Sequence, residues 1–180
     1  FFKEYKKRLD FANTIFVITG DHAMPEIPLQ SKIDRFHVPL LIYSPLLKGP
    51  KTFHNFVSHF DVAPTILAYY RENFGLKTPS QVTWIGEGLD KGASTQGDGI
   101  AMMQSKNQLI DFVKGSYHLS DGQLYKLDGV LNEDAAKDNA KEELSKRFEL
   151  FKRKNKLFYT QKRLLPDSVF TNYFNRTKKN

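Results

Sequence analysis

The sequence predicts an α/β protein, with strands and a helix in its first part and a small antiparallel sheet with a covering helix in its second part. Three observations support this class. Two apolar, β-branched runs at 14–19 and 37–45 are separated by a loop and precede a helical pattern. Two strand-like runs flank Asp121-Gly122, a strong signal for a hairpin turn. A charged amphipathic segment over 132–156 follows them.

Apolar periodicity and turn signals place the elements of the first part. They are, in order, the end of a basic helix over 2–11, a strand over 14–19, a loop with prolines over 23–34, a strand over 37–45 and a helix over 62–72. Pro39 near the start of the second strand is typical of a sheet edge. Asp61 is a plausible N-cap or first-turn acid of the helix.

The second part follows an irregular stretch over 73–99. Its expected elements are strands over 108–114, 116–119 and 123–127 and the helix over 132–156, with Leu144, Phe148 and Phe151 on one face. We therefore expect four regions: part of an α/β catalytic domain over 1–75, an irregular connection over 76–100, a subdomain of sheet and helix over 101–160, and a basic tail over 161–180.

The two strands of the first region are expected to be buried and joined by crossover units, as in a parallel sheet. Parallel strands need neighbours on the same sheet, and only two strands are visible here. The sequence also starts at Phe1 and not at Met. We therefore expect this region to be the last part of a larger sheet, in a piece of a longer protein.

Composition narrows the possible functions. The chain of 180 residues has a formal net charge of +7, which suits anionic partners. No nucleic-acid-binding motif accompanies this charge, so nucleic acid is not an expected partner. There is no cysteine, which excludes disulfides, thiolate metal sites and a cysteine nucleophile within this sequence. No apolar run approaches the roughly 18 residues of a membrane span.

The most informative motif is Asp21-His22, directly after the first apolar strand. Gly20 permits a tight exit from that strand, so that the two side chains emerge together at its end. A carboxylate oxygen and an imidazole nitrogen are ligands that Zn²⁺ or Mn²⁺ accepts. The alternative is a turn acid beside a surface imidazole. Two ligands do not close a metal site, so this chain is expected to hold only part of one.

Three segments in this order resemble a known family: Ile15 to His22, Phe36 to Pro45 and Val57 to Leu67. They are similar to the C-terminal third of the sulfatase-type catalytic domain in the alkaline phosphatase superfamily. The closest similarity is to the lipoteichoic acid synthase-like branch, the phosphoglycerol transferases. A looser similarity extends to Gln123–Asp128, which resembles the strand that closes the small C-terminal sheet of sulfatases.

The resemblance implies the C-terminal portion of an alkaline-phosphatase-like, mixed-sheet sandwich. It also implies that Asp21 and His22 bind the catalytic divalent ion, which could be Mn, Zn, Mg or Ca. In that family the other ligands and the nucleophile come from earlier strands. This sequence has neither such strands nor a sulfatase nucleophile signature. The 180-residue chain alone is therefore expected to be inactive.

Two details of the motif favour the synthase-like branch. Many relatives have Gly after the Asp-His pair, whereas Ala23 stands here. The second ligand position holds His22 and not Asn, as in branches with a hydroxyl nucleophile. Two further residues are candidates for substrate contact. His37 precedes the second strand, and Arg35 could bind an anion through two N–H groups. The alternative for His37 is a strand-entry residue that is hydrogen-bonded to the backbone. The alternative for Arg35 is an ordinary salt bridge.

The sequence thus predicts the C-terminal part of a metal-dependent phosphotransferase or hydrolase acting on phosphate or sulfate esters. Its expected partners are an anionic ester, either free or linked to lipid or glycan, and the rest of the catalytic domain. Family resemblance implies a cell-membrane, periplasmic or otherwise extracytoplasmic location, with membrane attachment through upstream segments. The alternative hypothesis is a non-catalytic module that binds anionic glycans or lipid headgroups.

Overall fold

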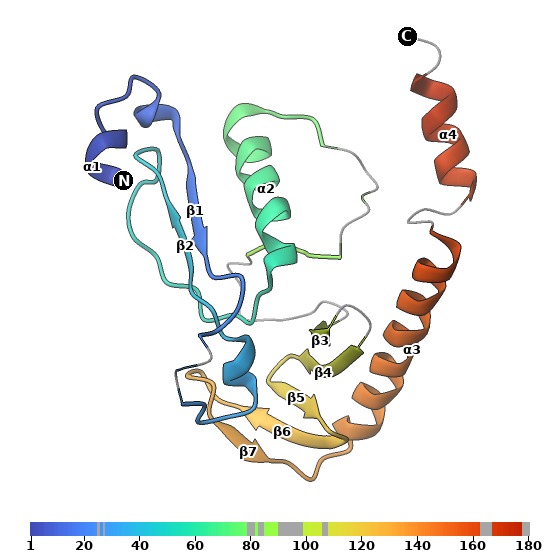
Figure 1. Ribbon diagram of the computed structural model, residues 1–180. Coiled ribbons are helices and arrows are strands. Elements are labelled where there is room, and N and C mark those ends of the chain that lie inside the picture. Colours follow the sequence, from blue (N-terminus) through green and yellow to red (C-terminus); the bar gives the residue numbers. More distant parts are fainter. Residues whose placement is uncertain are drawn as a thin grey trace. The chain divides into compact units, whose positions relative to one another are not determined.

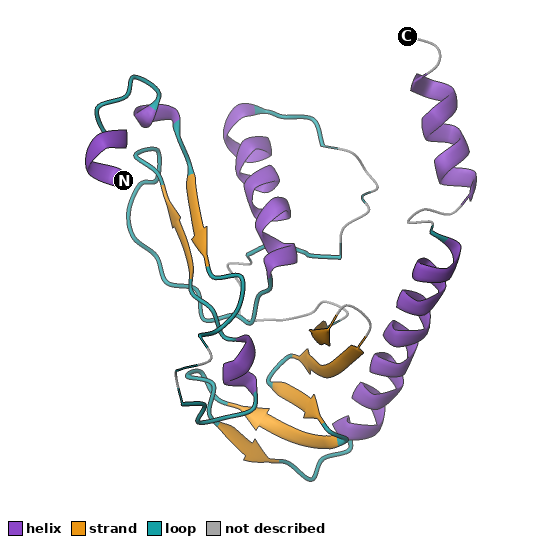
Figure 2. Cartoon of the chain, in the orientation of Figure 1, coloured by secondary structure: helices purple, strands orange, loops and turns teal. Residues whose placement is uncertain are grey.

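The computed structural model of the chain describes residues 1–24, 26, 28–78, 82, 85–89, 99–105, 108–162 and 167–177 (Figure 1). It divides into two compact units, one formed by 1–54 with 126–134 and the other by 55–125 with 135–180. Helices, strands and loops are mixed along the chain (Figure 2). The predicted α/β class is confirmed, with one two-stranded and one five-stranded sheet. No helix among the described residues is both long and apolar enough to cross a membrane.

The first unit is built on a two-stranded sheet. Its elements are α1 (Phe2–Tyr5), the 3₁₀ helix η1 (Phe11–Asn13), β1 (Phe16–Thr19), the 3₁₀ helix η2 (Ile33–Phe36) and β2 (Leu40–Tyr43). Both predicted strands are therefore present, each shorter than expected.

The two strands of the first unit were expected to be parallel and joined by a crossover, and this expectation is wrong. β1 and β2 pair antiparallel, with Phe16 opposite Tyr43 and Thr19 opposite Leu40. A parallel pair needs a crossover of a dozen or more residues, usually containing an α-helix. The described part of the connection holds only the single 3₁₀ turn η2. The two strands can therefore pair antiparallel, because the chain reverses through the loop.

The expected burial of these strands is also wrong for the structure. Val17 is 36% exposed, Ile18 41% and Leu41 57%. Successive side chains of a strand point to opposite faces of its sheet. Val17 and Ile18 thus place apolar side chains on opposite faces of the sheet. Among the described residues this sheet has two strands, and both of these side chains are partly exposed.

One end of this sheet is held by aromatic packing around Phe16. Its ring centroid lies 5.0 Å from those of Phe2 and Tyr5, and 6.1 Å from those of Phe11 and Tyr43. Phe2 and Tyr5 meet Phe16 edge to face, which is a favoured geometry for aromatic pairs. This cluster fixes the Phe16–Tyr43 end of the sheet and leaves the Thr19–Leu40 end free for other roles.

The second unit contains the remaining helices and most of a five-stranded sheet of order β3-β4-β5-β6-β7. Its elements are η3 (His59–Asp61), α2 (Val62–Phe74), β3 (Ile100–Ser105), β4 (Gln108–Lys114), β5 (Tyr117–Ser120), β6 (Gln123–Leu127), β7 (Glu133–Ala135), α3 (Ala140–Gln161) and α4 (Asp167–Thr177). The division between the two units falls within β6 and β7.

The helix predicted over 62–72 is confirmed as α2, and Asp61 secures its start. Asp61 is 9% exposed, and its Oδ2 accepts hydrogen bonds from the backbone N–H of Ser58 at 2.7 Å and from the Ser58 hydroxyl at 3.0 Å. Its Oδ1 accepts from the backbone N–H groups of Glu87 at 2.8 Å and Gly88 at 3.1 Å. One carboxylate thus joins the start of the helix to a loop far along the chain.

The hairpin predicted at Asp121-Gly122 is confirmed between β5 and β6. Asp121 has a φ of 49° and Gly122 one of 72°. Two central residues with positive φ are typical of the type I′ turn that joins right-twisted strands. The strand predicted over 108–114 coincides with β4, whereas β3 was not predicted.

The covering helix begins later than predicted. The segment expected to open it forms β7 instead, and α3 starts at Ala140, whose backbone N–H donates to Asp138 Oδ1 at 3.1 Å. The backbone N–H of Ala136 donates to the carbonyl of Leu124 at 2.9 Å, which holds this segment against the sheet. Within the basic tail, residues Asp167–Thr177 form α4.

The core of the second unit lies between its sheet and α3. Leu144 and Phe148, one turn apart on α3, pack with buried residues of three strands, namely Phe112, Leu119 and Leu124. The Phe112 and Phe148 rings stack with centroids 5.3 Å apart and planes inclined by 18°. Full burial of one such side chain contributes about 1.5–3 kcal/mol. The amphipathic pattern thus identified the face of α3 that meets the sheet.

A buried acid–imidazole pair joins β4 to β5 within this unit. Asp111 is 1% exposed and His118 0%. His118 Nε2 lies 3.3 Å from Asp111 Oδ2. Removing one member of a buried ion pair leaves the other without compensation and costs about 3–5 kcal/mol. His118 and Asp111 therefore lie side by side in the interior of the second unit.

The turn between β6 and β7 is organised by Asp128. Its Oδ1 accepts hydrogen bonds from the backbone N–H groups of Val130 and Asn132, both at 2.9 Å, and its Oδ2 accepts one from Asn132 Nδ2 at 2.7 Å. The Asn132 side chain contributes most to lowering the pKa of the Asp128 carboxyl below its ordinary value, followed by the two backbone donors. These bonds hold Leu131, whose φ is 70°, in a left-handed conformation.

We predict that Asp111→Ala and His118→Ala each lower the free energy of unfolding by about 3–5 kcal/mol, because each leaves a buried polar partner. The double variant should cost less than the sum of the two single variants. Urea unfolding measures all three. Asp134→Ala, at an exposed site, is the control and should change stability by about 0.5 kcal/mol or less. The prediction would be contradicted if each single variant changed the free energy of unfolding as little as this control does.

We predict that Asn132→Ala raises the pKa of Asp128 toward the ordinary value of 3.8, because it removes the strongest donor to the carboxylate. A lowered carboxyl pKa stabilises the folded state above the pKa of the unfolded chain, and this stabilisation is lost as pH falls through the folded pKa. On acidification, the variant should therefore lose the stabilisation by the Asp128 carboxylate at a higher pH than the wild type does. NMR titration of the Asp128 carboxyl carbon measures the change.

Asn139→Ala is the matched control, because Asn139 precedes α3 without a side-chain capping bond. It should leave the Asp128 titration unchanged. An Asp128 pKa that does not move in Asn132→Ala would show that the side-chain bond does not set it.

Candidate metal-binding site at the end of β1

The site begins where β1 ends, at Gly20. A Cβ atom at this position would lie 3.2 Å from Cγ1 and 3.3 Å from Cβ of Val38, which is tighter than most real contacts. Glycine therefore lets the backbone after β1 pass close to the segment that leads into β2. The next two residues are Asp21 and His22, so this close approach positions the candidate ligands.

Asp21 and His22 are mutually oriented by local hydrogen bonds. The backbone N–H of His22 donates to Asp21 Oδ1 at 3.1 Å, and His22 Nδ1 lies 2.8 Å from the carbonyl oxygen of Ala23. A carbonyl oxygen only accepts, so Nδ1 carries the proton in this bond. In the neutral ring the lone pair then resides on Nε2, which lies 3.8 Å from Asp21 Oδ2.

These two atoms fit a divalent metal ion. Zinc bonds to imidazole nitrogen and carboxylate oxygen are about 2.0–2.2 Å long. Two such bonds together exceed the 3.8 Å between His22 Nε2 and Asp21 Oδ2, so one ion can contact both atoms. Both side chains are open to solvent, His22 being 71% exposed and Asp21 93%. The Nδ1 bond to Ala23 fixes the imidazole orientation, as partners of metal-ligating histidines usually do.

The pKa of His22 is raised above its ordinary value. The bond to the Ala23 carbonyl is the larger cause, and the negative charge of Asp21 adds to it. Both favour the protonated ring. The same carboxylate that would share a metal with His22 therefore also stabilises its imidazolium form.

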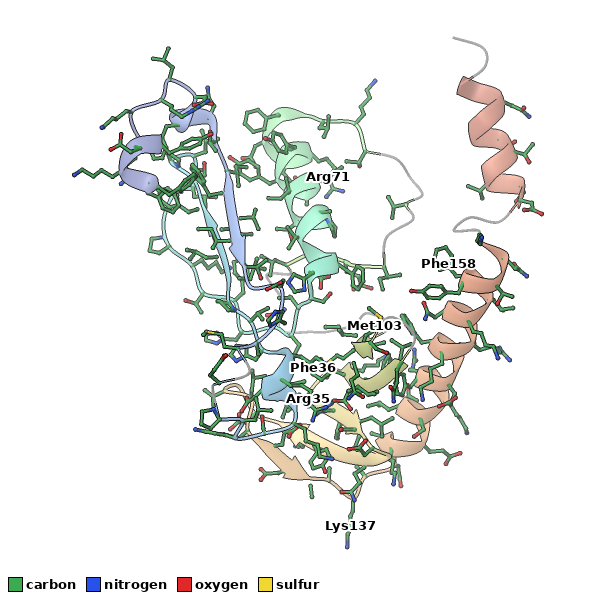
Figure 3. The ribbon with its side chains drawn as sticks, in the orientation of Figure 1. Arg35, Phe36, Arg71, Met103, Lys137 and Phe158 are labelled. Atoms are coloured by element: carbon green, nitrogen blue, oxygen red, sulfur yellow. The ribbon has the colours of Figure 1, made fainter. Side chains whose placement is uncertain are left out.

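The predicted substrate-contact residues lie just before β2. Arg35 belongs to η2, is exposed, and has its guanidinium carbon 5.8 Å from the centre of the Phe36 ring (Figure 3). His37 follows η2, is exposed, and donates its backbone N–H to the carbonyl of Asp34 at 3.1 Å. This bond uses only the backbone of His37, and the residue is exposed to solvent.

Asp34 organises the loop that carries these residues. Its Oδ2 accepts from the backbone N–H groups of Gln30 at 2.8 Å and Ser31 at 2.9 Å. Burial raises the pKa of the Asp34 carboxyl, but the bonds from Ser31 and Gln30, with a smaller contribution from His37, outweigh it and lower the pKa overall. Asp34 is therefore a negative neighbour that holds the loop, and Arg35 places a positive charge next to it in the sequence.

Antiparallel pairing brings the candidate residues to one end of the sheet. Thr19, the last residue of β1, lies opposite Leu40, the first residue of β2. The pair Asp21-His22 follows β1 and His37 precedes β2, so both flank the same end. In the parallel arrangement that the sequence suggested, the start of β2 would lie at the opposite edge. The corrected pairing thus strengthens the grouping of the predicted site residues.

The described residues do not complete a metal site. In the described part of the chain, no group of three or more His, Asp or Glu side chains is gathered so as to hold an ion. Sequence analysis did not single out the Asp111–His118 pair, although an acid inside an apolar strand was a visible signal. That pair is fully buried and belongs to the other unit, so we assign it to stability.

Comparisons with known proteins bear on residues 1–70, which match the family model described as Sulfatase. No curated protein and no solved structure matches the chain significantly. The matched range contains the β1–β2 sheet, the Asp21-His22 pair, and the first part of α2. Residues 1–70 are therefore similar to the Sulfatase family, and the match covers less than half of the chain.

Proposed function

We propose that this chain supplies part of the metal site of a sulfatase-type enzyme, with Asp21 and His22 as ligands of a divalent cation. The observation that carries the proposal is the pair of ligand atoms, 3.8 Å apart at the exposed end of β1, within the range that matches sulfatases. Enzymes of the sulfatase family are generally metal-dependent hydrolases. The ion, when bound, would lower the pKa of a nucleophilic hydroxyl and offset charge on the transferred group.

The remaining candidates act on the ester. Arg35 offers several N–H donors in a planar array that matches two oxygens of a phosphate or sulfate group. His37 can add a proton donor from the same end of the sheet. With Asp21 and His22 at that end, the chain would present cation-binding and anion-binding groups together. We infer that the substrate is an anionic phosphate or sulfate ester.

We further propose that the parent enzyme is of the phosphoglycerol transferase type, similar to lipoteichoic acid synthases. His22 as second ligand and Ala23 after it support this branch. Such an enzyme transfers its group through a hydroxyl nucleophile, which would come from sequence outside this chain. Its substrate would be linked to lipid or glycan, and its site would lie outside the cytoplasm. These finer statements rest on sequence resemblance.

The surface of the β1–β2 sheet supports a role as part of a larger catalytic domain. Val17 and Ile18 present apolar side chains on opposite faces, and Leu41 is 57% exposed. A strand that is apolar on both faces is typical of a sheet enclosed between two layers. We propose that further strands and covering helices of the catalytic domain pack here. Such packing would also supply the missing metal ligands.

We predict that Mn²⁺ and Zn²⁺ bind weakly to the chain and that Asp21→Ala/His22→Ala abolishes this binding. Two ligands give a low affinity, and removing both leaves no chelating pair at the end of β1. Calorimetry measures the affinity. Paramagnetic broadening by Mn²⁺ in NMR spectra should be centred on residues 20–23.

The control for this experiment is His54→Ala/Asp134→Ala, which removes one exposed imidazole and one exposed carboxylate elsewhere. It should bind metal as the wild type does. Metal binding that survives the Asp21/His22 double variant, or Mn²⁺ broadening centred on another segment, would overturn the assignment.

We predict that Arg35→Ala weakens binding of inorganic phosphate by about tenfold or more, because a hydrogen bond to a charged group contributes about 1.5–3 kcal/mol. NMR titration with phosphate, followed at the His37 ring, measures the affinity. Arg8→Ala is the matched control, since Arg8 already bonds Asp10 at 2.9 Å. Equal phosphate affinity of Arg35→Ala and the wild type would contradict an anion-binding role for Arg35.

A further inference from the structure

The loop that carries Arg35 and His37 is held by a residue from a distant part of the chain. Glu133, the first residue of β7, accepts a hydrogen bond at its Oε2 from the backbone N–H of Lys32 at 2.6 Å. The two residues are 101 positions apart in the sequence, and both belong to the first compact unit. Glu133 thus connects the strand after the β6–β7 turn to the segment before β2.

Three successive backbone N–H groups of this loop donate to carboxylates. Gln30 and Ser31 donate to Asp34 Oδ2, at 2.8 and 2.9 Å. Lys32 donates to Glu133 Oε2. The bonds of Asp34 shape the loop from within, because Asp34 belongs to the loop itself. The bond of Glu133 comes from another strand, so it fixes the place at which the 3₁₀ helix η2 begins.

The start of η2 is fixed at two adjacent residues. Lys32 is the N-cap of η2, and its backbone N–H is the donor to Glu133. Ile33, the next residue, is 3% exposed. A backbone hydrogen bond on one residue and a buried side chain on the next leave this point little freedom to move. Arg35 follows two residues later, and Figure 3 shows it together with Phe36 on η2.

The backbone that carries Glu133 is itself held in place. The preceding residue, Asn132, donates to Asp128 from its backbone N–H at 2.9 Å and from its Nδ2 at 2.7 Å. Its carbonyl accepts a bond from the Asp128 backbone N–H at 3.2 Å. Glu133 therefore starts from a fixed turn, and its partly buried side chain reaches Lys32 from there.

We propose that Glu133 is a positioning residue for anion binding, which orients Arg35 and His37 by holding the start of η2. This inference rests on the proposed function of those two residues as ligands of a phosphate or sulfate ester. Groups bind best when neighbouring residues hold them in the productive geometry before the ligand arrives. Glu133 is negatively charged and would itself repel an anion, so its benefit to anion binding must come from position and not from charge.

Two variants of Glu133 separate its hydrogen bond from its charge. Glu133→Gln keeps a carbonyl oxygen at the same reach and loses the charge. Glu133→Asp keeps the charge and is one methylene shorter, which withdraws the carboxylate from the Lys32 N–H. NMR titration of the full chain with inorganic phosphate, followed at the His37 ring, measures the affinity. Glu133→Asp should weaken phosphate binding roughly 2- to 30-fold, the range expected for a residue that acts through others. Glu133→Gln should bind phosphate at least as tightly as the wild type does.

The hydrogen bond itself is measured without phosphate. Hydrogen exchange of the Lys32 amide should be faster in Glu133→Asp than in the wild type and unchanged in Glu133→Gln. Asp134→Asn is the matched control, because it removes one negative charge at the next position, which is exposed. Its Lys32 exchange and its phosphate affinity should stay within about twofold of the wild type. Circular dichroism verifies that each variant keeps its secondary structure.

The proposal is supported if Glu133→Asp speeds Lys32 exchange and weakens phosphate binding while Glu133→Gln restores both. It is overturned if Glu133→Asp leaves phosphate affinity or Lys32 exchange unchanged, or if both variants weaken binding equally. In those cases the wild type still binds phosphate through Arg35, and the proposed function stands. A wild-type chain that does not bind phosphate would overturn the proposed roles of Arg35 and His37, and the positioning role of Glu133 with them.

Discussion

The antiparallel pairing of β1 with β2 is the constraint on which the candidate site depends. With Thr19 opposite Leu40, the chain leaves one strand and enters the other at the same end of the sheet. Asp21-His22 and the segment of Arg35 and His37 are thereby brought to that end. The aromatic cluster around Phe16 secures the opposite end. A parallel pairing of the same strands would have separated the candidate metal ligands from the anion-binding candidates.

The second unit depends on a different kind of interaction. Its apolar core is continuous from the sheet to α3, and the buried Asp111–His118 pair lies within the same sheet. A buried pair adds to stability only when both members are present, so it specifies one arrangement of the strands more than it strengthens the core. This core also holds the first half of α3, and the rest of the helix can therefore project its cations and leucines to solvent.

The proposed metal site has a definite geometric requirement. Metal binding needs a few ligand atoms at set positions, and Asp21 and His22 would provide two of them under our proposal.

Much of this protein followed from local sequence. The hairpin at Asp121-Gly122 and the amphipathic face of α3 were predicted correctly, because turn geometry and helical period act over a few residues. Metal binding by Asp21 and His22 stays a prediction. The predicted start of α3 was wrong, because residues 133–135 pair with the sheet, and this pairing outweighed their helix propensity. Only the tertiary structure decided that β1 and β2 run antiparallel and stay exposed, since strand direction and burial depend on contacts between segments far apart in the chain.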